Sequence, residues 1–489
     1  MSSLKTAKMT NYRWVICAML FFATTVNYLD RQVLSLTWDE FIKPEFHWDE
    51  SHYGKITSIF SIVYAICMLF AGRFIDWMGT KKGYIWAIVV WSLGACLHAF
   101  CGMFTESWLG LEGKAELVKA TGDAAVVIAT VSMYAFLFAR CVLALGEAGN
   151  FPAAIKVTAE YFPKRDRAFA TSIFNSGASI GALIAPVSIP PLAKFFQDKG
   201  IGNGWEMAFI VIGLLGFIWA GLWIFLYTPP AKSKHVNQAE LVYIEQDQED
   251  LTNVKKDSEV DDEGPKLSFL ECFQFKQTWA FAFGKFMTDG VWWFFLFWTP
   301  SYLNTQFGIK TTDPLGMILI FSLYLVTMLS IYGGKLPTII INKTGKNPYA
   351  ARMQAMLIFA FFPLVVLLAQ PLGTISPWFP VILIGIGGAA HQSWSANIFS
   401  TVSDMFPKSA VATITGIGGM AGGVGSMILQ WVAGDLFVYA GETNMHFLGF
   451  EGKPAGYFII FCVCAVAYLI GWMVMKSLVP KYKPVVVEK

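Results

Sequence analysis

Six ionisable side chains lie inside otherwise apolar stretches of this sequence. They are Asp30 and Arg31 in "TTVNYLDRQVLSL", Arg140 and Glu147 in "FARCVLALGEAGN", and Lys285 and Asp289 in "GKFMTDGVWW". A charge at the centre of a bilayer costs several kcal/mol unless it is paired or hydrated. Three of the six are positive and three are negative, which favours mutual pairing around a hydrated cavity.

The chemistry of these groups suits the carriage of an anion together with a proton. Arginine stays charged and presents a planar fork that fits a carboxylate. A carboxyl group in a semi-apolar cavity can take up and release a proton near neutral pH. Arg140 and Glu147 are spaced to share one helix face, about 10 Å apart, and Lys285 and Asp289 have i,i+4 spacing. The alternative, that the pairs only fasten helices together, has most weight for Lys285 and Asp289.

A polar belt interrupts a second apolar stretch, "FPVILIGIGGAAHQSWSANIFSTVSDMFP". Hydroxyl-rich ligands need such donors and acceptors, and an indole ring can stack on a sugar face. The alternative for each single residue is a hydrogen bond between neighbouring helices. The candidate ligand-binding residues, besides Arg31 and Arg140, are therefore Tyr28, Tyr64, Asn175, His391, Gln392, Trp394 and Asn397.

The composition defines the environment of these residues. The chain has 489 residues, of which 55% are hydrophobic and 14% are charged, whereas soluble domains carry roughly 25% charged residues. An integral membrane protein is therefore expected. The net charge of +2 is too small to favour nucleic-acid binding.

Hydrophobic runs of about 20 residues predict transmembrane helices, six before a polar stretch and six after it. The first six are expected near 14–36, 53–72, 84–103, 125–147, 168–194 and 206–227. The second six are expected near 277–303, 315–334, 351–370, 378–400, 411–434 and 456–476. The predicted fold is an all-α membrane protein with residues 1–227 and 277–489 as two six-helix bundles, joined by a solvated linker, 228–276, that contains a partial surface helix.

Lysine and arginine are concentrated in alternate loops, the linker and both termini, which places those segments in the cytoplasm. The two halves also resemble each other. "EYFPKRDRAFATSIFNSGASIG" from Glu160 and "DMFPKSAVATITGIGGMAGGVG" from Asp404 share spaced Phe, Pro, Lys, Ala, Thr, Ile and Gly residues at an offset of half the chain. A duplicated six-helix unit of this kind is typical of transporters.

The loop "AGRFIDWMGTKK" carries glycines that allow close helix approach and an acid that can pair with lysines. Gly72, Asp76, Gly79 and Lys82 are therefore predicted to form a conformational latch. Two other motifs are weaker. "GASIG" matches a nucleophile elbow, but inside a predicted span its glycines favour helix packing. "HWDESH" favours a solvated loop with helix capping over a metal site. We expect no catalytic residue, no metal and no cofactor.

"NYLDRQVLSLTW", "AGRFIDWMGTKKG", "GEAGNFPAAIKV", "KFMTDGVWWFFLFWTPSYL" and "HQSWSANIFSTVSDMFPK" together resemble bacterial hexuronate transporters. These belong to the anion:cation symporter branch of the major facilitator superfamily. The resemblance implies proton-coupled uptake of glucuronate or galacturonate across the inner membrane by a monomer. It implies that Arg31 engages the substrate carboxylate, that Asp30 and Glu147 carry protons, and that Arg140 pairs with the acids.

Several alternatives stay open at this stage. The same charges would serve a carrier of aldonates, aldarates or dicarboxylates, and sodium could replace the proton. No residue in the fifth span matches a glutamine sometimes found in aldonate carriers, which disfavours galactonate. A membrane sensor is disfavoured because no output domain follows the spans. Only "GASIG" would support an enzyme.

Overall fold

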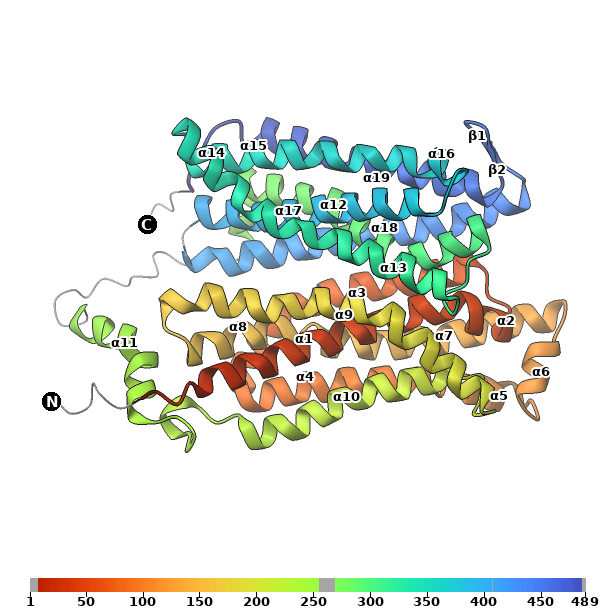
Figure 1. Ribbon diagram of the computed structural model, residues 1–489, viewed down its shortest axis with the longest axis horizontal. Helices are drawn as coiled ribbons and strands as arrows, with labels where there is room; N and C mark the ends of the chain where they lie inside the picture. The colour runs from red at the N-terminus through yellow and green to blue at the C-terminus, as the bar shows by residue number, and fades with distance from the viewer. Residues whose placement is uncertain (1–7, 255–268, 407, 486–489) are drawn as a thin grey trace.

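The computed structural model describes residues 8–254, 269–406 and 408–485. The chain forms a bundle of long helices that run in roughly the same direction, with both chain ends at one end of the bundle (Figure 1). We call that end the terminal face and the other end the opposite face. The only strands in the described residues are β1 (His446–Phe447) and β2 (Phe450–Glu451), a short antiparallel pair.

The first half of the chain is helical up to residue 226. Its helices are α1 (Tyr12–Thr37), a π-helical turn η2 (Trp38–Ile42), α2 (Lys43–Phe46), α3 (Glu50–Met78), α4 (Thr80–His98), α5 (Cys101–Leu109), α6 (Lys114–Lys119), α7 (Asp123–Glu147), α8 (Asn150–Tyr161), α9 (Lys164–Asp198) and α10 (Trp205–Leu226). The connection to the second half contains the 3₁₀ turns η3 (Pro230–Lys232) and η4 (Glu271–Gln274) and the helix α11 (Gln238–Val254).

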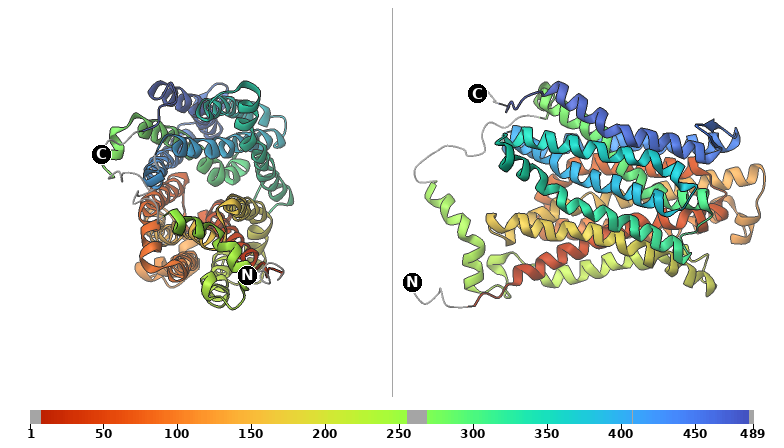
Figure 2. Two further views of the ribbon diagram at one scale, coloured as in Figure 1. Left: turned by 90° about the vertical axis from the view of Figure 1, so that its left-hand side faces the viewer. Right: turned by 45° about the horizontal axis from the view of Figure 1, so that its top comes forward.

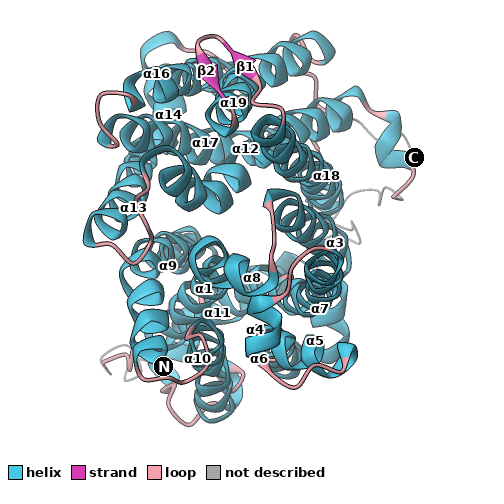
Figure 3. Cartoon of the chain, turned by 90° about the vertical axis from the view of Figure 1, so that its right-hand side faces the viewer, coloured by secondary structure: helices cyan, strands magenta, loops and turns pink. Residues whose placement is uncertain are grey.

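The second half repeats this pattern of long helices. Its helices are α12 (Lys276–Phe307), α13 (Pro314–Thr327), the 3₁₀ segment η5 (Met328–Lys335), α14 (Leu336–Thr344), α15 (Pro348–Phe361), the 3₁₀ segment η6 (Phe362–Leu368), α16 (Ala369–Gly373), α17 (Trp378–Met405), α18 (Lys408–Glu442) and α19 (Lys453–Leu478). Views from the two ends place α12 to α19 beside α1 to α10 as two groups (Figures 2 and 3).

Each of the twelve predicted spans coincides with a helix or a run of helices. In the described part of the chain, seven helices are long and apolar enough to cross a membrane, and α4 with α5, bent by 54°, would make an eighth. Outside this set are α1, α12 and α17, which carry four of the six charged residues singled out above and the polar belt. Helices of that composition require polar neighbours, so we expect them to line an interior site.

Small residues set the distance between α1 and α9. A Cβ added to Gly177 would lie 2.5 Å from the carbonyl oxygen of Phe21, and one added to Gly181 would lie 2.5 Å from that of Thr25. "GASIG" is therefore a helix-packing motif within α9, as the sequence predicts. In "HWDESH", Asp49 and His52 form the capping box of α3. Helix capping is what the sequence predicts for this motif.

The linker is not simply a solvated segment, because α11 packs against the start of α1. The N-cap of α1, Asn11, makes no side-chain cap. The carboxylate of Glu240 supplies one instead, since it accepts hydrogen bonds from the backbone N–H groups of Tyr12 (2.9 Å) and Arg13 (3.1 Å) and from the Arg13 guanidinium (3.0 Å). The side chain of Glu240 is fully buried. A carboxylate at a helix N-terminus also stabilises the helix dipole.

Protonation of Glu240 is expected to release α11 from α1. Burial alone would raise the pKa of Glu240, but hydrogen bonds from Thr10, Arg13 and Tyr12 outweigh it and hold the pKa below its usual value. The docking is therefore at full strength above about pH 4.3, the ordinary glutamate value, and is lost as the pH falls through the lowered pKa. The protection of α11 amides against hydrogen exchange, measured relative to their intrinsic exchange rate at each pH, should fall in that acid range.

The variant Glu240→Ala is expected to show the same rapid exchange at neutral pH, because loss of a cap costs about 1 kcal/mol and loss of the Arg13 ion pair adds to it. Glu245→Gln, on the same helix, is the matched control and should leave exchange unchanged. Slow exchange of α11 in Glu240→Ala at pH 7 would contradict the docking role.

Candidate functional site

The centre of the first half holds a buried ion pair between α1 and α7. Arg31 Nε and Nη2 lie 3.0 and 2.7 Å from one oxygen, Oε2, of Glu147, and the two side chains are 4% and 0% exposed. The other oxygen, Oε1, has no hydrogen-bond partner among the described residues. Such a buried and incompletely satisfied pair points to a functional site, because buried polar groups are otherwise nearly always hydrogen-bonded.

Aromatic rings surround the guanidinium of Arg31. The centroids of Tyr28, Tyr64 and Trp293 lie 5.2, 4.8 and 4.7 Å from its central carbon. These distances allow cation–π contacts, which are strongest where water is excluded. Trp293 belongs to α12 in the second half of the chain, so this contact joins the two halves directly at the ion pair.

Asp30 faces away from Arg31, although the two residues are adjacent. Trp91 of α4 donates a hydrogen bond of 2.9 Å from its indole nitrogen to Asp30 Oδ2. Asp30 is 1% exposed, and its second oxygen, Oδ1, is without a partner within the described ranges. Consecutive residues of a helix point about 100° apart, so one carboxyl group enters the interior of the first half while the arginine faces α7 and α12.

Arg140 is fully buried but does not bond to either acid. Its Nη2 donates to the backbone carbonyl of Arg31 at 2.9 Å, and its guanidinium lies 4.7 Å from the ring centroid of Phe60. The rise of the helix separates Arg140 from Glu147 by about 10 Å along the same axis, so Glu147 pairs with Arg31 across helices instead. The pairing implied for Arg140 is thus absent from the described contacts, and Arg140 Nε and Nη1 have no partner there.

A cavity of about 410 Å³ lies between the two halves. This volume is in the range of small-molecule sites, about 300–1,000 Å³. Its wall contains many hydroxyl and amide groups and no charged side chain. The lining residues are Tyr28, Phe151, Asn175, Ala178, Ser179, Ala182, Trp292, Tyr324, Thr327, Ser330, Gln392, Ser395, Ala396 and Phe399. Tyr28 connects the cavity to the ion pair, because its ring also contacts Arg31.

The polar belt of α17 divides between two faces of the helix. Gln392 lines the cavity together with Ser395. His391, Trp394 and Asn397 are buried on the other side. His391 Nδ1 lies 2.8 Å from the Tyr468 hydroxyl, and Asn397 donates to the Ser393 carbonyl. Of the candidates in this belt, only Gln392 faces the cavity directly.

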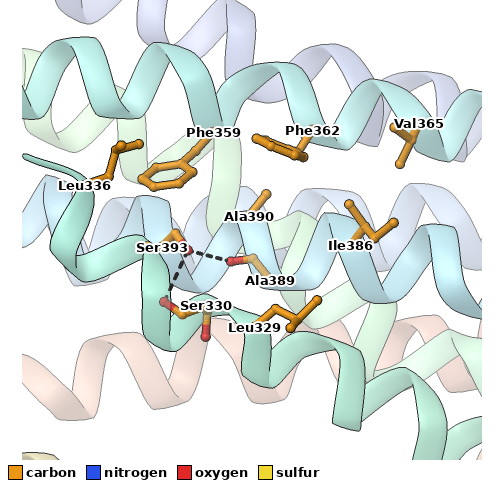
Figure 4. Close-up of a pocket in the computed structure, with 11 residues that line it drawn as sticks. Leu329, Ser330, Leu336, Phe359, Phe362, Val365, Ile386, Ala389, Ala390 and Ser393 are labelled. Atoms are coloured by element: carbon orange, nitrogen blue, oxygen red, sulfur yellow. Dashed lines mark hydrogen bonds between the residues drawn. The ribbon is translucent and has the colours of Figure 1, made fainter. Parts of the chain in front are cut away.

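A larger cavity of about 550 Å³ lies within the second half, between η5, α15 and α17 (Figure 4). Its labelled side chains are almost all apolar, and Leu329 and Phe362 are exposed on the outer surface of the helices. The Ser393 hydroxyl donates to the backbone carbonyls of Ala389 and Ser330. The polar groups in this wall are therefore hydrogen-bonded to each other. An anion finds no partner there, so we place the ligand site in the smaller, polar cavity.

The predicted latch is only partly visible. The side chain of Asp76 lies outside the described residues. Gly79 connects α3 to α4 with φ 78° and ψ 150°, a conformation that favours glycine. A Cβ on Gly72 would meet no described atom within 4 Å, so the expected close helix approach at Gly72 is not found. Lys82 is exposed, while Lys81 donates to the Ile224 carbonyl of α10.

The halves are fastened together near the opposite face. Glu40 accepts hydrogen bonds from Thr311 (3.2 Å) and from the hydroxyl of Thr312 (2.6 Å), Asn304 donates to Asp39, and Lys453 pairs with Glu50 at 2.6 Å. Closer to the middle, Ser61 bonds to Ser426. The structure is therefore closed at the opposite face.

Glu40→Ala is expected to weaken this closure. Hydrogen bonds to a charged group contribute about 1.5–3 kcal/mol, so opening at the opposite face should become roughly 10- to 100-fold more populated. Ser35, buried between the halves and 3.4 Å from the Leu296 carbonyl, provides a reporter. In a variant with its native cysteines replaced, Ser35→Cys should react faster with a membrane-impermeant maleimide when Glu40 is alanine.

The exposed Glu442 at the same face supplies the control, and Glu442→Ala should not change the labelling rate. Equal labelling with and without Glu40→Ala would show that the Glu40 contacts do not hold the halves together.

Two helical halves, a closed face and a polar cavity between them define a multi-pass membrane transporter. The family model of the Major Facilitator Superfamily matches residues 20–429, and the chain belongs to this family. The fold class predicted from the sequence is thereby confirmed. The chain is a transport protein and not an enzyme, because its relatives are transporters.

The relatives with similar sequences are named for the sugar acids they transport. The hexuronate transporter of Escherichia coli K12 is 28% identical over 96% of this chain and 94% of its own length. A probable galactarate/D-glucarate transporter of the same strain is 26% identical over 87% of this chain and 88% of its own length. The galacturonate transporter of Dickeya chrysanthemi is 25% identical over 68% of this chain and 83% of its own length.

Among solved structures, a bacterial homologue of the human lysosomal transporter Spinster, in an inward-facing and occupied conformation, has a TM-score of 0.65 at 17% identity, covering 96% of this chain and 97% of that one. At 17% identity, the similarity between the two structures supports a shared fold only.

Proposed function

We propose that this protein carries hexuronates such as glucuronate and galacturonate together with protons across a bacterial inner membrane. The observation that carries the proposal is the buried Arg31–Glu147 pair beside a polar cavity at the junction of the two halves. An arginine fork fits a carboxylate, and the hydroxyl and amide wall fits a polyhydroxylated body. The relatives, which include hexuronate and galacturonate transporters, support the same class of substrate.

The chemistry of the pair suggests how substrate and proton are linked. Glu147 occupies the fork of Arg31 when the cavity is empty, so a substrate carboxylate must displace it. A displaced glutamate in an apolar interior is costly unless it is protonated. Glu147 therefore takes up a proton as the substrate binds Arg31, and Asp30 provides a second protonation site beside Trp91. Arg140 fixes the backbone of α1 at Arg31 through its carbonyl bond.

Alternating access follows from the asymmetry between the two faces. The Lys and Arg bias supports a cytoplasmic terminal face, and with that orientation a structure closed at the opposite face would present the cavity to the cytoplasm. Gln392, Asn175 and Tyr28 from both halves contact the sugar part of the substrate. The latch loop at Gly79 and Lys82 acts at the terminal face when that face closes. A monomer contains all of these parts.

A second candidate function is transport of aldarates, favoured by the similarity to a probable galactarate/D-glucarate transporter. Uptake of labelled galacturonate into proteoliposomes with an inward proton gradient separates the two. Accumulation that a protonophore abolishes, and that glucuronate but not galactarate competes, is the expected result. Uptake of galactarate alone would retain the mechanism and overturn the hexuronate assignment. Accumulation insensitive to the protonophore but dependent on sodium would overturn proton coupling.

A further inference from the structure

The second half of the chain contains its own charged pair beside the cavity. Lys285 Nζ lies 2.8 Å from Asp289 Oδ2 on α12, and the side chains are 6% and 15% exposed. Residues of α12 from Ala280 to Leu303 include none that is exposed, so the pair lies within the protein and not on its outer surface. A buried ion pair can often be replaced by apolar residues without loss of stability. Stability alone therefore does not explain why Lys285 and Asp289 are here, and a function has to be considered.

The surroundings of this pair place it at the edge of the polar cavity. Lys285 Nζ lies 4.3 Å from the ring centroid of Phe399, and that ring lines the cavity. Lys285, Asp289 and Trp292 are spaced i, i+4 and i+7, so they share one face of α12, and Trp292 is also a lining residue. The three side chains thus form a continuous strip that leads from Trp292, on the wall of the cavity, to the ion pair at its edge.

The pair has unused hydrogen-bonding capacity. Asp289 Oδ1 has no partner in the described part of the chain, and an ammonium group has three donors, of which the described contacts of Lys285 use one. On the other side, Asp289 lies against bare backbone, because a Cβ at Gly422 of α18 would come within 2.2 Å of its carboxylate. The ion pair is neutral overall, and it has an unused acceptor, Asp289 Oδ1, next to the unused donors of Lys285 Nζ.

This arrangement matches neighbouring hydroxyl groups of a sugar ring. One hydroxyl of such a ring can donate to Asp289 Oδ1 while the next accepts from Lys285 Nζ, and hydrogen bonds to charged groups are the strong ones. A neutral pair attracts no net charge, so it does not compete with Arg31 for the substrate carboxylate. The indole of Trp292 supplies an apolar surface beside it. Its ring is held parallel to His391 at 5.7 Å, and His391 bonds to Tyr468.

We propose that Lys285 and Asp289 form the subsite that recognises a vicinal pair of hydroxyl groups on the substrate ring. The proposal rests on the proposed function and extends it from a carboxylate site to a specificity site for polyhydroxylated acids. Substrate selection is then divided between the halves, with the acid group bound by the first half and the hydroxyl pattern by the second. His391 acts through Trp292 as a positioning residue.

The test compares galacturonate with its 2-, 3- and 4-monodeoxy analogues as competitors of labelled galacturonate binding. The primary variant is Lys285→Met/Asp289→Asn, which leaves no unpaired charge in the interior. Wild-type protein should lose about 10- to 100-fold in affinity when either of two neighbouring hydroxyls is removed, the fold-change expected for a hydrogen bond to a charged group. In the double variant each of these deletions should change the affinity less than about threefold, since the partners of both hydroxyls are gone.

The matched control is another i,i+4 lysine–aspartate pair, Lys194 and Asp198 on α9, whose side chains are 50% and 62% exposed. Lys194→Met/Asp198→Asn should keep the wild-type ranking of analogues. A second variant, Asp289→Asn alone, removes the charged acceptor and should flatten the response to one of these two hydroxyls, so the test does not depend on one protein folding. Thermal unfolding of each variant verifies that it is folded.

The results separate this proposal from the function on which it rests. Equal loss of affinity for galacturonate and all deoxy analogues in the double variant, or no loss for any, would overturn the hydroxyl subsite while sugar-acid binding stands. Wild-type protein that binds none of these acids would overturn both.

Discussion

Arg31→Gln is expected to abolish measurable hexuronate uptake. The substitution removes the fork that binds the carboxylate, and truncation of one member of a buried, hydrogen-bonded charge pair costs about 2–5 kcal/mol in binding. That range corresponds to a loss of roughly 30-fold to several thousand-fold in affinity. Isothermal titration of purified protein with galacturonate measures the binding, and uptake into proteoliposomes measures transport.

Two further variants separate loss of the fork from loss of charge balance. Arg31→Lys keeps the charge but loses the planar fork, so its affinity should lie between those of wild type and Arg31→Gln. Arg31→Gln/Glu147→Gln leaves no unpaired glutamate inside the protein, and it should bind as poorly as Arg31→Gln. Recovery of binding in this double variant would mean that Arg31 serves to neutralise Glu147 rather than to hold the substrate.

Asp30→Asn is expected to abolish uphill accumulation while substrate exchange continues. Asparagine has the shape of aspartic acid and can still accept the hydrogen bond from Trp91, but it cannot release a proton. A carrier that moves one proton with each anion can accumulate substrate about tenfold for each unit of pH difference. The variant should reach only the external concentration under the same gradient. Counterflow, which requires no net proton movement, should stay within a few-fold of wild type.

Glu147→Gln provides the comparison for Asp30→Asn. It should lose accumulation and also change affinity, since the amide no longer competes as an anion for Arg31. Trp91→Phe removes only the indole donor and should keep accumulation, with a shifted dependence on pH. Full accumulation by Asp30→Asn at a pH difference of one unit would exclude Asp30 as a coupling residue and leave Glu147 as the candidate.

The helices of this fold could be predicted from the sequence because hydrophobic length is a strong signal. Each expected span corresponds to helical structure, for example 14–36 to α1 and 456–476 to α19. The interruptions could not be predicted. Residues 315–334 pass from α13 into the 3₁₀ segment η5, and 84–103 bend between α4 and α5. Such breaks depend on packing against neighbouring helices, which leaves no periodic pattern.

The sequence indicates which residue types the candidate site contains, but not which contacts they make. Asp30 and Arg31 are both buried at the centre, but adjacency in sequence concealed that they face different helices. On α17 the sequence indicated a polar belt, whereas helical spacing from Gln392 to Ser395 and Phe399 would have separated the cavity face from that of His391 and Trp394. Trp293, the ring that joins the second half to Arg31, had no distinguishing signal among its aromatic neighbours.

The cap that α11 gives to α1 affects the order in which the chain matures during synthesis. Tyr12 and Glu240 are separated by 228 residues, and ribosomes add roughly 5–20 residues per second. About 10–45 s therefore pass between the emergence of the first helix and that of the carboxylate that completes its first turn. During that interval the beginning of α1 has unpaired N–H groups, and it stays in contact with water or with the insertion machinery. The first bundle is finished only when the segment that leads to the second bundle has been made.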